Sequence, residues 1–302
     1  MRTTFINELT MLTAVNDNIH LVVGDLGFSV IEEFRDQYPG NFLNASVAEQ
    51  NMTGLAAGMA SEGCHVFTYS IANFPTFRCA EQIRNDIDYH NLPVTVVVVG
   101  GGVAYGALGY SHHAVQDFAL IRTMPNMLIA APGDPLETKA CLNYLVKNPQ
   151  PSYLRLGKNG EVNFNANSPS VQPGQWNLIK KSSNADNKIA IVTTGAVLNR
   201  AMQINEKLDY DVYSMPLWGM KYKEQQLGNI SGYDSVITIE EHLLDAGFGS
   251  WMLESLPNQP HERSKIRSFG LSSDVCGMVG KQDTLLDACL DLNELIEKQD
   301  GI

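Results

Sequence analysis

The chain has 302 residues, of which 44% are hydrophobic, and a formal net charge of -12 at pH 7. This acidity excludes nucleic acid and anionic membrane surfaces as main partners, because both are bound through basic patches. The length predicts two domains with a buried core in each, and five cysteines without CxxC spacing favour reduced thiols over a zinc site or a disulfide framework.

Short apolar segments alternate with helical patterns along the chain. The segment Val94–Val99 has no polar alternation, as expected for a central parallel strand that is covered on both faces. Strands are predicted at Ile19–Val23, Cys64–Tyr69, Val94–Val99, Met127–Ala130, Ser152–Leu156, Ile189–Thr193, Asp211–Ser214, Val236–Ile239 and Ile266–Phe269. Helices are predicted at Phe5–Val15, Val47–Glu62, Thr76–His90, Val115–Met124, Leu136–Leu145, Ala196–Leu208, Lys221–Leu227, Phe248–Leu256 and Thr284–Glu297. This rhythm predicts an α/β fold with two domains, each a mostly parallel sheet flanked by helices.

The boundary between the domains is indicated by composition. The stretch Glu161–Asn187 is rich in Asn, Ser and Pro, which is typical of an interdomain connection. We therefore predict a first domain at 1–165, a linker at 166–187 and a second domain at 188–302.

Glu49 is a lone acid at the start of a small, apolar helical segment. Carboxylates are rarely buried unless they are paired or hydrogen-bonded, so Glu49 is expected to have a special partner, for which a nitrogen of a bound heterocycle is a candidate. The alternative is that Glu49 caps its own helix, helped by the helix dipole.

A glycine-rich loop follows the central strand. The glycines at 100–102 allow the backbone to approach a ligand closely, and the loop ends in a pair of histidines, His112 and His113. A histidine at such a position can serve as an acid/base group, although an isolated histidine is more often structural.

Six stretches in the first 160 residues together resemble the pyrimidine-binding domain of the thiamine-diphosphate enzymes of the transketolase and deoxyxylulose-phosphate synthase group. Each is a weak motif alone, but their order and spacing match. They are GDLGFS (24–29), VAEQNMTGLAAGMASEG (47–63), YSIANFPTFRCAEQIRNDIDYHNLPV (69–94), GGGVAYGALGYSHHAVQDFALIR (100–122), PGDPLET (132–138) and PSYLRLGKNG (151–160).

The resemblance implies a cofactor site for thiamine diphosphate. In the family, a glutamate at the position of Glu49 hydrogen-bonds the aminopyrimidine ring and thereby activates the cofactor. Phe74 and Phe77 match the aromatic wall of that ring, with ordinary core packing as the alternative, and Asp25 is a further cofactor-binding candidate.

The resemblance also implies a substrate site. His112 matches the histidine that contacts the substrate oxygens and assists proton transfer, and His113 is a second substrate-binding candidate. The positions that match the family's sugar-phosphate contacts, together with the lysine beside them, are Arg2, Ser29, Arg155 and Lys158.

Two departures from the transketolase pattern concern sugar recognition. Gly100 stands where transketolases have a histidine, and Leu108 stands where they have an aspartate. Because sites built on hydrogen bonds reject analogues strongly, the loss of two polar side chains predicts an unusual, deoxy or branched sugar.

The GDG motif, through which the family holds magnesium and the diphosphate, is absent from the sequence. The resemblance therefore implies the C-terminal subunit of a split transketolase that works in the cytoplasm. Its partner would be the N-terminal subunit with the diphosphate site and the Mg²⁺ ligands, in an α2β2 heterotetramer, and a metal site on this chain is not expected. No stretch resembles a signal peptide or a membrane span.

The expected reaction is transfer of a two-carbon ketol unit between sugar phosphates. Two alternatives remain at the level of sequence: a decarboxylating subunit of the deoxyxylulose-phosphate synthase or 2-oxo-acid dehydrogenase beta type, and a non-catalytic interaction subunit. In the second half, Glu240, Glu241 and His242 form an acid/base cluster to which we assign structural roles, because strand-end acids are easily stabilised by a helix N-terminus.

Overall fold

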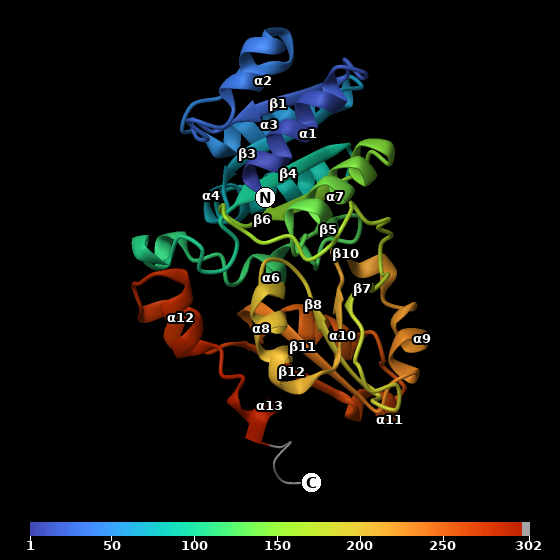
Figure 1. Cartoon of the computed structure of the whole chain (residues 1–302). Coiled ribbons are helices and arrows are strands. Elements are labelled where there is room, and N and C mark those ends of the chain that lie inside the picture. Colours follow the sequence, from blue (N-terminus) through green and yellow to red (C-terminus); the bar gives the residue numbers. More distant parts are fainter. Residues whose placement is uncertain (298–302) are drawn as a thin grey trace.

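A computed structural model describes residues 1–297; residues 298–302, the end of the predicted second domain, lie outside the described residues. Two sheets are present, one above the other in Figure 1, and both are flanked by helices. The prediction of two α/β domains is confirmed. The first sheet has seven strands in the order β10-β5-β6-β4-β3-β1-β2, namely β1 (Ile19–Val23), β2 (Phe42–Asn44), β3 (His65–Ile71), β4 (Val94–Val99), β5 (Leu128–Ala130), β6 (Ser152–Leu156) and β10 (Leu217–Trp218).

The central strand β4 explains why the first sheet is covered on both sides. Val94, Val96 and Val98 belong to one hydrophobic cluster, whereas Val97 and Val99 belong to another. Successive strand residues point to opposite faces, so an uninterrupted apolar strand requires helices on both. The helices of this domain are α1 (Arg2–Thr13), α2 (Glu32–Gln37), α3 (Glu49–Ser61), α4 (Asn73–Arg78), α5 (Ala80–Gln82), the π-helix η2 (Ile83–Asp88), α6 (Asp117–Ile121) and α7 (Pro135–Lys147).

The second sheet has five strands in the order β12-β11-β8-β9-β7 and is parallel except for the β7–β9 pair. Its strands are β7 (Asn177–Lys180), β8 (Ile189–Thr193), β9 (Asp211–Ser214), β11 (Ser235–Leu243) and β12 (Ile266–Leu271). Its helices are α8 (Leu198–Leu208), α9 (Gln226–Ser231), α10 (Phe248–Glu254), α11 (Pro260–Ser264), α12 (Gln282–Cys289) and α13 (Asn293–Glu297). Short 3-10 turns connect the elements at η1 (Pro39–Asn41), η3 (Gly106–Leu108), η4 (Tyr110–His112), η5 (Met220–Tyr222) and η6 (Ser273–Gly277).

The structure also contains α2, β2 and α11, which were not predicted, and three further differences concern the arrangement of the domains and of the site. β7 lies inside the segment predicted as a linker, so the second sheet begins earlier in the chain than expected. β10 pairs antiparallel with β5 and extends the first sheet with residues from the second half. The helix predicted over 76–90 is divided at Cys79, whose φ of -111° and ψ of 15° leave the helical region.

The two domains share a continuous core. The ring of Trp218 on β10 contacts Phe118 of the first domain and Phe248 and Trp251 of α10, with centroid distances of 5.1 to 5.4 Å. Aromatic pairs at such distances add to the free energy of burial. The domains are therefore joined by packing as well as by the chain. Among the described residues, none of the helices has the length and apolar character needed to cross a membrane.

Candidate functional site

Most of the predicted site residues gather at the carboxyl edge of the first sheet. Asp25 and Ser29 follow β1, Phe74 follows β3, and the glycine-rich loop that carries His112 follows β4. Glu49 opens α3, the helix after β2. In open parallel sheets, ligands bind outside the carboxyl ends of the strands, so this edge is the candidate active site.

Glu49 is buried and paired. Its side chain is 4% exposed, and its Oε1 accepts a hydrogen bond of 2.9 Å from the Nη1 of Arg78. The residue at the N-cap of α3 is Ala48, which offers no side-chain cap, and the carboxylate of Glu49 is turned to Arg78. The carboxylate also lines a surface hollow together with Val47. Glu49 is thus an acid at a helix start that faces an open site.

Arg78 links the two residues predicted to be catalytic. Its guanidinium carbon lies 4.3 Å from the centre of the Phe74 ring, and that ring makes an edge contact with His112 at 5.2 Å. Glu49, Arg78, Phe74 and His112 therefore form one continuous row. Sequence reasoning missed Arg78, although the expectation that a buried acid needs a partner could have pointed to an arginine near the aromatic pair.

His112 lies in η4, half-buried, with its Nδ1 3.0 Å from the hydroxyl of Ser111. Asn73 of α4 fixes this turn by donating to the carbonyl of Ser111 at 3.1 Å. Burial lowers the pKa of His112, and the nearby His113 and Arg78 lower it further. The imidazole is consequently neutral near pH 7 and can accept a proton from a substrate hydroxyl.

The other predicted ligand contacts differ in how accessible they are to a ligand. His113 is fully buried and its Nε2 lies 3.5 Å from the carbonyl of Gly106, a placement that does not favour direct substrate contact. Phe77 is 43% exposed, beside Arg78 in the chain. Asp25 has a left-handed backbone and exchanges two hydrogen bonds with Asn44, of 2.9 and 3.2 Å. Its role as a cofactor contact stays a prediction.

A second cavity lies at the same edge, where Arg2, Tyr69, Ser70 and Tyr105 are set among apolar residues such as Phe28. The Oγ of Ser70 and the Nε of Arg2 are buried there without a hydrogen-bond partner among the described residues. The ammonium of Lys158 lies 5.2 Å from the centre of the Tyr105 ring. Two cations and a buried hydroxyl without a partner favour an anionic or polyhydroxylated ligand.

Ser29 lies next to this cavity, with a left-handed backbone, and its N–H donates to Glu32 at 2.7 Å. Its phosphate contact stays a prediction.

Tyr105 explains the glycine at position 100. A Cβ on Gly100, whose φ is +82°, would lie 2.1 Å from the Tyr105 ring. The ring therefore fills the space beside Gly100. The interpretation of Gly100 as a lost polar contact stays a prediction, and Tyr105 brings a phenol to the neighbouring cavity. Leu108 is 58% exposed and supplies no polar group.

Arg155 was predicted to hold a phosphate, but the structure commits its guanidinium elsewhere. The side chain is 4% exposed and is paired with Asp117 at 2.7 Å, and its Nη2 donates to the carbonyls of Ala114 and Glu241. Burial opposes the charge, yet Asp117 and Glu241 hold the pKa of Arg155 above its ordinary value. In this conformation Arg155 joins the domains, so a phosphate contact would require it to leave Asp117.

The loop glycines also make close contacts within the protein. A Cβ on Gly101 would lie 2.6 Å from the Nε of Arg155, and one on Gly102 would lie 2.3 Å from the carboxyl carbon of Glu241. These glycines make room for the protein's own side chains. The close approach of the backbone to a ligand stays a prediction.

The cluster Glu240, Glu241 and His242 is buried between the domains. Burial raises the pKa of Glu240 to about 8, while its carboxylate accepts the N–H groups of Phe248 and Gly249 at the start of α10. Burial lowers the pKa of His242 to about 4, so its approach to Asp117 at 4.0 Å is not an ion pair near neutral pH. This arrangement fits the structural role predicted for the cluster. Within residues 1–297 no group of acidic, histidine or cysteine side chains could hold a metal ion.

Comparison with known proteins agrees with this geometry. The family described as "Transketolase, pyrimidine binding domain" matches residues 1–160. The putative transketolase C-terminal section of Methanocaldococcus jannaschii is 30% identical over 95% of this chain and 90% of its own length. An apulose-4-phosphate transketolase subunit of Phocaeicola vulgatus is 30% identical over 86% of this chain and 84% of its own length.

A solved structure, described as a split gene transketolase in the form of an inactive beta4 tetramer, is 28% identical, with a TM-score of 0.81 over 95% of this chain and 92% of that one. The chain belongs to the transketolase family, and the resemblance inferred from the sequence is confirmed.

Proposed function

We propose that the chain is the subunit of a split transketolase that carries the pyrimidine-binding and C-terminal domains, and that the complex transfers a two-carbon ketol unit between phosphorylated sugars. The observation that carries the proposal is the row of Glu49, Arg78, Phe74 and His112 at the carboxyl edge of the first sheet. It combines a buried acid, an aromatic wall and a neutral histidine in a chain of the transketolase family.

The residues present fit the aminopyrimidine half of thiamine diphosphate. Glu49 would hold a ring nitrogen, and Phe74 would supply an apolar wall beside the hollow that Val47 and Glu49 line. When bound, this cofactor supplies the nucleophilic carbon that adds to a ketose carbonyl. A carboxylate that is 4% exposed stabilises a protonated ring nitrogen more strongly than an exposed one, because water screens it less.

His112 would accept and return the proton of a substrate hydroxyl. Its pKa, lowered by burial, keeps the imidazole unprotonated, and Ser111 and Phe74 orient the ring. The substrate's anionic end would lie in the cavity of Arg2, Ser70 and Tyr105, with the ammonium of Lys158 5.2 Å from the Tyr105 ring. An altered sugar remains the expected substrate, a view supported by the name of the apulose-4-phosphate relative.

The Mg²⁺ and diphosphate contacts would come from a partner chain, with an α2β2 heterotetramer as the proposed assembly. The sequence has no GDG motif, and the two relatives are described as a C-terminal section and as one subunit of a transketolase. The inactive beta4 tetramer of the similar split transketolase supports the expectation that this chain alone does not turn over substrate.

Calorimetry tests this proposal. The purified chain should bind thiamine diphosphate and Mg²⁺ weakly or not at all until a partner chain with the GDG motif is added. Tight, magnesium-dependent binding by the chain alone would show the two-subunit proposal to be wrong. Reconstituted activity with pyruvate in place of a ketose would identify the decarboxylating alternative, and an inert but assembled complex would identify an interaction subunit.

A further inference from the structure

The loop at 100–116, here called the histidine loop, is held together at its base within the first domain. Gly102 and Ala114 form an isolated antiparallel bridge, with N–H to carbonyl distances of 3.0 and 2.8 Å in the two directions. Between these residues the chain makes the turns η3 and η4, and η4 contains His112. The bridge fixes the base of the loop but leaves the position of the turns to other contacts.

In the first domain, Asn73 donates to the carbonyls of Tyr110 and Ser111 at 3.4 and 3.1 Å. The other contacts come from the second domain. The carboxylate of Glu241 accepts the N–H of Val103 at 2.8 Å, and the N–H of Gly280 donates to the carbonyl of Gly106 at 3.2 Å. The N–H of Leu243 donates to the carbonyl of Val115 at 3.0 Å. Figure 1 shows α12 of the second domain close to the green segment that contains the histidine loop.

The glycines at positions 102 and 106 of the loop leave the space that the second domain needs for these contacts. Gly102 has a φ of +66°, and a Cβ there would lie 2.3 Å from the carboxyl carbon of Glu241. A Cβ on Gly106 would lie 2.4 Å from the side chain of Leu285 on α12. Since such separations do not occur between real atoms, larger residues at either position would push the second domain away from the loop.

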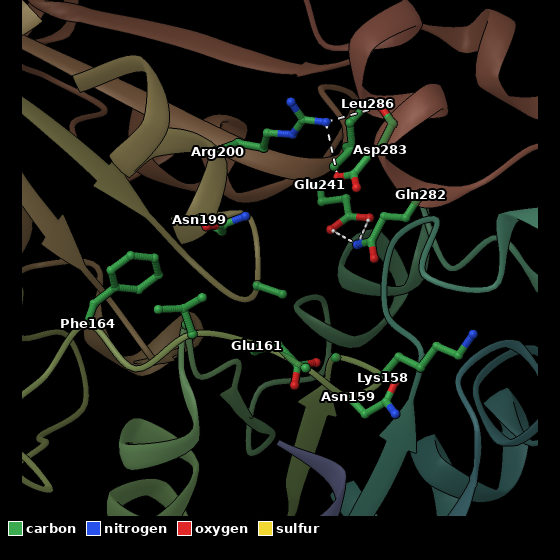
Figure 2. Close-up of a pocket in the computed structure, with 15 residues that line it drawn as sticks. Lys158, Asn159, Glu161, Phe164, Asn199, Arg200, Glu241, Gln282, Asp283 and Leu286 are labelled. Carbon is green, nitrogen blue, oxygen red and sulfur yellow. Dashed lines mark hydrogen bonds and ion pairs between the residues drawn. The ribbon is translucent and has the colours of Figure 1, made fainter. Parts of the chain in front are cut away.

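Glu241 is the polar centre of this interface. The register of β11 against β12 shifts between Ile239 and Leu243, and irregular strand positions re-aim side chains. The Glu241 side chain is 2% exposed and accepts two further hydrogen bonds, of 2.9 and 3.1 Å, from the amide of Gln282 on α12 (Figure 2). Burial raises its pKa, and Arg155, the Val103 N–H and Gln282 oppose that rise.

The cavity in front of Glu241 does not offer a simpler explanation of this acid. Figure 2 shows Lys158 at the edge of that cavity with its amine directed away from Glu241 and Arg200. Arg200 is itself paired with Asp283 and Asp287, at 3.2 and 2.8 Å. Within the described part of the chain, the Glu241 carboxylate accepts its hydrogen bonds from Val103 of the loop and from Gln282 of α12.

We propose that Glu241 is a positioning residue of the active site: by holding Val103, it helps to fix the histidine loop, so that the second domain sets the position of His112 together with Asn73 of the first domain. Glu241 does not touch substrate or cofactor. The kinetic part of the inference rests on the proposed function, whereas its structural part does not.

The test is an NMR titration of His112 in the full chain, which needs neither cofactor nor partner. His112 faces Phe74 and Arg78 on α4, with Ser111 and His113 beside it. Glu241→Ala should release Val103 and expose the imidazole, so that the pKa of His112 rises toward its ordinary value of 6.5. Glu241→Gln keeps an oxygen that can accept the Val103 N–H and should restore much of the wild-type titration.

Glu240→Gln is the matched control. Glu240 is the adjacent acid and is also fully buried, but within residues 1–297 its carboxylate accepts hydrogen bonds from Phe248 and Gly249 of α10, with the Nδ1 of His242 at 3.9 Å, and none from the histidine loop. This variant should change stability and leave the His112 titration where it is. If Glu241 had a purely structural role, Glu241→Ala and Glu240→Gln would have the same effect on the His112 titration.

Activity in the reconstituted complex gives the second readout. Glu241→Ala should lower kcat by about tenfold or more with little change in KM, since a displaced acid/base group weakens the chemical step rather than substrate binding. A complex that is inactive in its wild-type form would count against the proposed function and leave the NMR test decisive.

A folded Glu241→Ala protein with an unchanged His112 titration would overturn the proposal, and so would an equal shift in Glu240→Gln. If Glu241→Ala does not fold, Gln282→Ala decides in its place. That substitution removes the two hydrogen bonds that orient the carboxylate while leaving the Val103 contact possible, and it should shift His112 in the same direction by a smaller amount.

Discussion

At the scale of single residues, a buried acid and an exposed base make an unequal pair. Arg78 is about half exposed, whereas Glu49 is almost completely buried. The guanidinium lies on Phe74 and against the Glu49 carboxylate, which are the two groups assigned to the pyrimidine ring. A flexible, half-exposed arginine can move away. The contacts that Arg78 makes with Glu49 and Phe74 can therefore be replaced by contacts with a bound ligand.

The first prediction concerns Glu49. Glu49→Gln keeps the shape of the side chain but cannot stabilise a protonated ring nitrogen, so the reconstituted complex should assemble and lose about a hundredfold or more in kcat. Glu62→Gln, at the other end of α3, is the control and should keep full activity. Steady-state rates decide the matter. Full activity in Glu49→Gln would reduce Glu49 to a residue of helix packing.

The second prediction concerns Arg78. If its guanidinium occupies the contacts of the pyrimidine ring, Arg78→Ala should tighten thiamine-diphosphate binding to the reconstituted complex by a few-fold, because no ion pair then has to be exchanged. Arg84→Ala, on the neighbouring π-helix, is the control. Calorimetry with the assembled complex measures the effect, and weaker binding in Arg78→Ala would instead make Arg78 a cofactor contact.

The third prediction separates two arginines that sequence similarity grouped together. Arg155→Ala leaves Asp117 buried without its cation and should lower the free energy of unfolding by about 3 to 5 kcal/mol. Arg2→Ala removes a cationic side chain from the cavity that Arg2 lines. It should chiefly raise KM for a phosphorylated donor. Urea unfolding and steady-state kinetics measure the two effects. A stable Arg155→Ala protein with a raised KM would restore its predicted role as a phosphate anchor.

At the scale of elements, the sequence predicted those whose pattern is set by local burial. β4 and β6 have the predicted bounds, and α3 begins within two residues of its prediction, because a buried apolar run or a strong helical period identifies the element by itself. β7 and β10 were missed because each is short and is a strand only through a partner distant in the chain, β9 and β5 respectively.

The candidate site shows the same limit. Glu49, Phe74 and His112 were found from residue type and spacing, and the structure brings them together. The contacts that depend on the other domain were not foreseeable. Gly102 and Arg155 carry no local sign that their partners are Glu241 and Asp117.

The fourth prediction concerns helix α7, whose first turn is hydrogen-bonded to the second domain through Glu137 and Ser214. Asp134 caps this helix and accepts the N–H groups of Phe164 and Asn165, while Glu137 accepts from Ser214 at 2.7 Å. Burial raises the pKa of Glu137 to about 7, from an ordinary value of 4.5. The folded protein thus keeps a proton that the unfolded chain releases between these two pH values.

Stability contributed by protonated Glu137 is therefore full below pH 4.5 and is lost as the pH rises to about 7, by about 3 kcal/mol over that window. Glu137→Gln cannot titrate, so its free energy of unfolding should depend less steeply on pH than that of the wild type. Urea unfolding at several pH values between 5 and 8 gives both slopes. Parallel slopes would contradict the raised pKa.

At the scale of the whole molecule, each of the two domains contributes strands or contacts that stabilise the first domain. β10 gives the first sheet an edge strand from the second half of the chain, and the second domain contacts the loop that carries His112. A site at the edge of one domain therefore depends on the integrity of the other. This dependence gives the C-terminal domain a role in the site although it supplies none of the predicted catalytic groups.

The last prediction follows from that shared core. Trp218 is fully buried and contacts rings of both domains, so Trp218→Ala should lower the free energy of unfolding by about 3 to 5 kcal/mol. Because β10 pairs with the first sheet while Trp251 belongs to the second domain, both halves should still melt in one calorimetric transition at a lower temperature. Trp176→Ala is the comparison variant. The aromatic partners of Trp176, Tyr213 and Tyr233, both lie in the second domain, so among the described residues this substitution removes no aromatic contact between the domains. Two separate transitions in the wild-type chain would show that the domains unfold independently and that the shared core does not couple them.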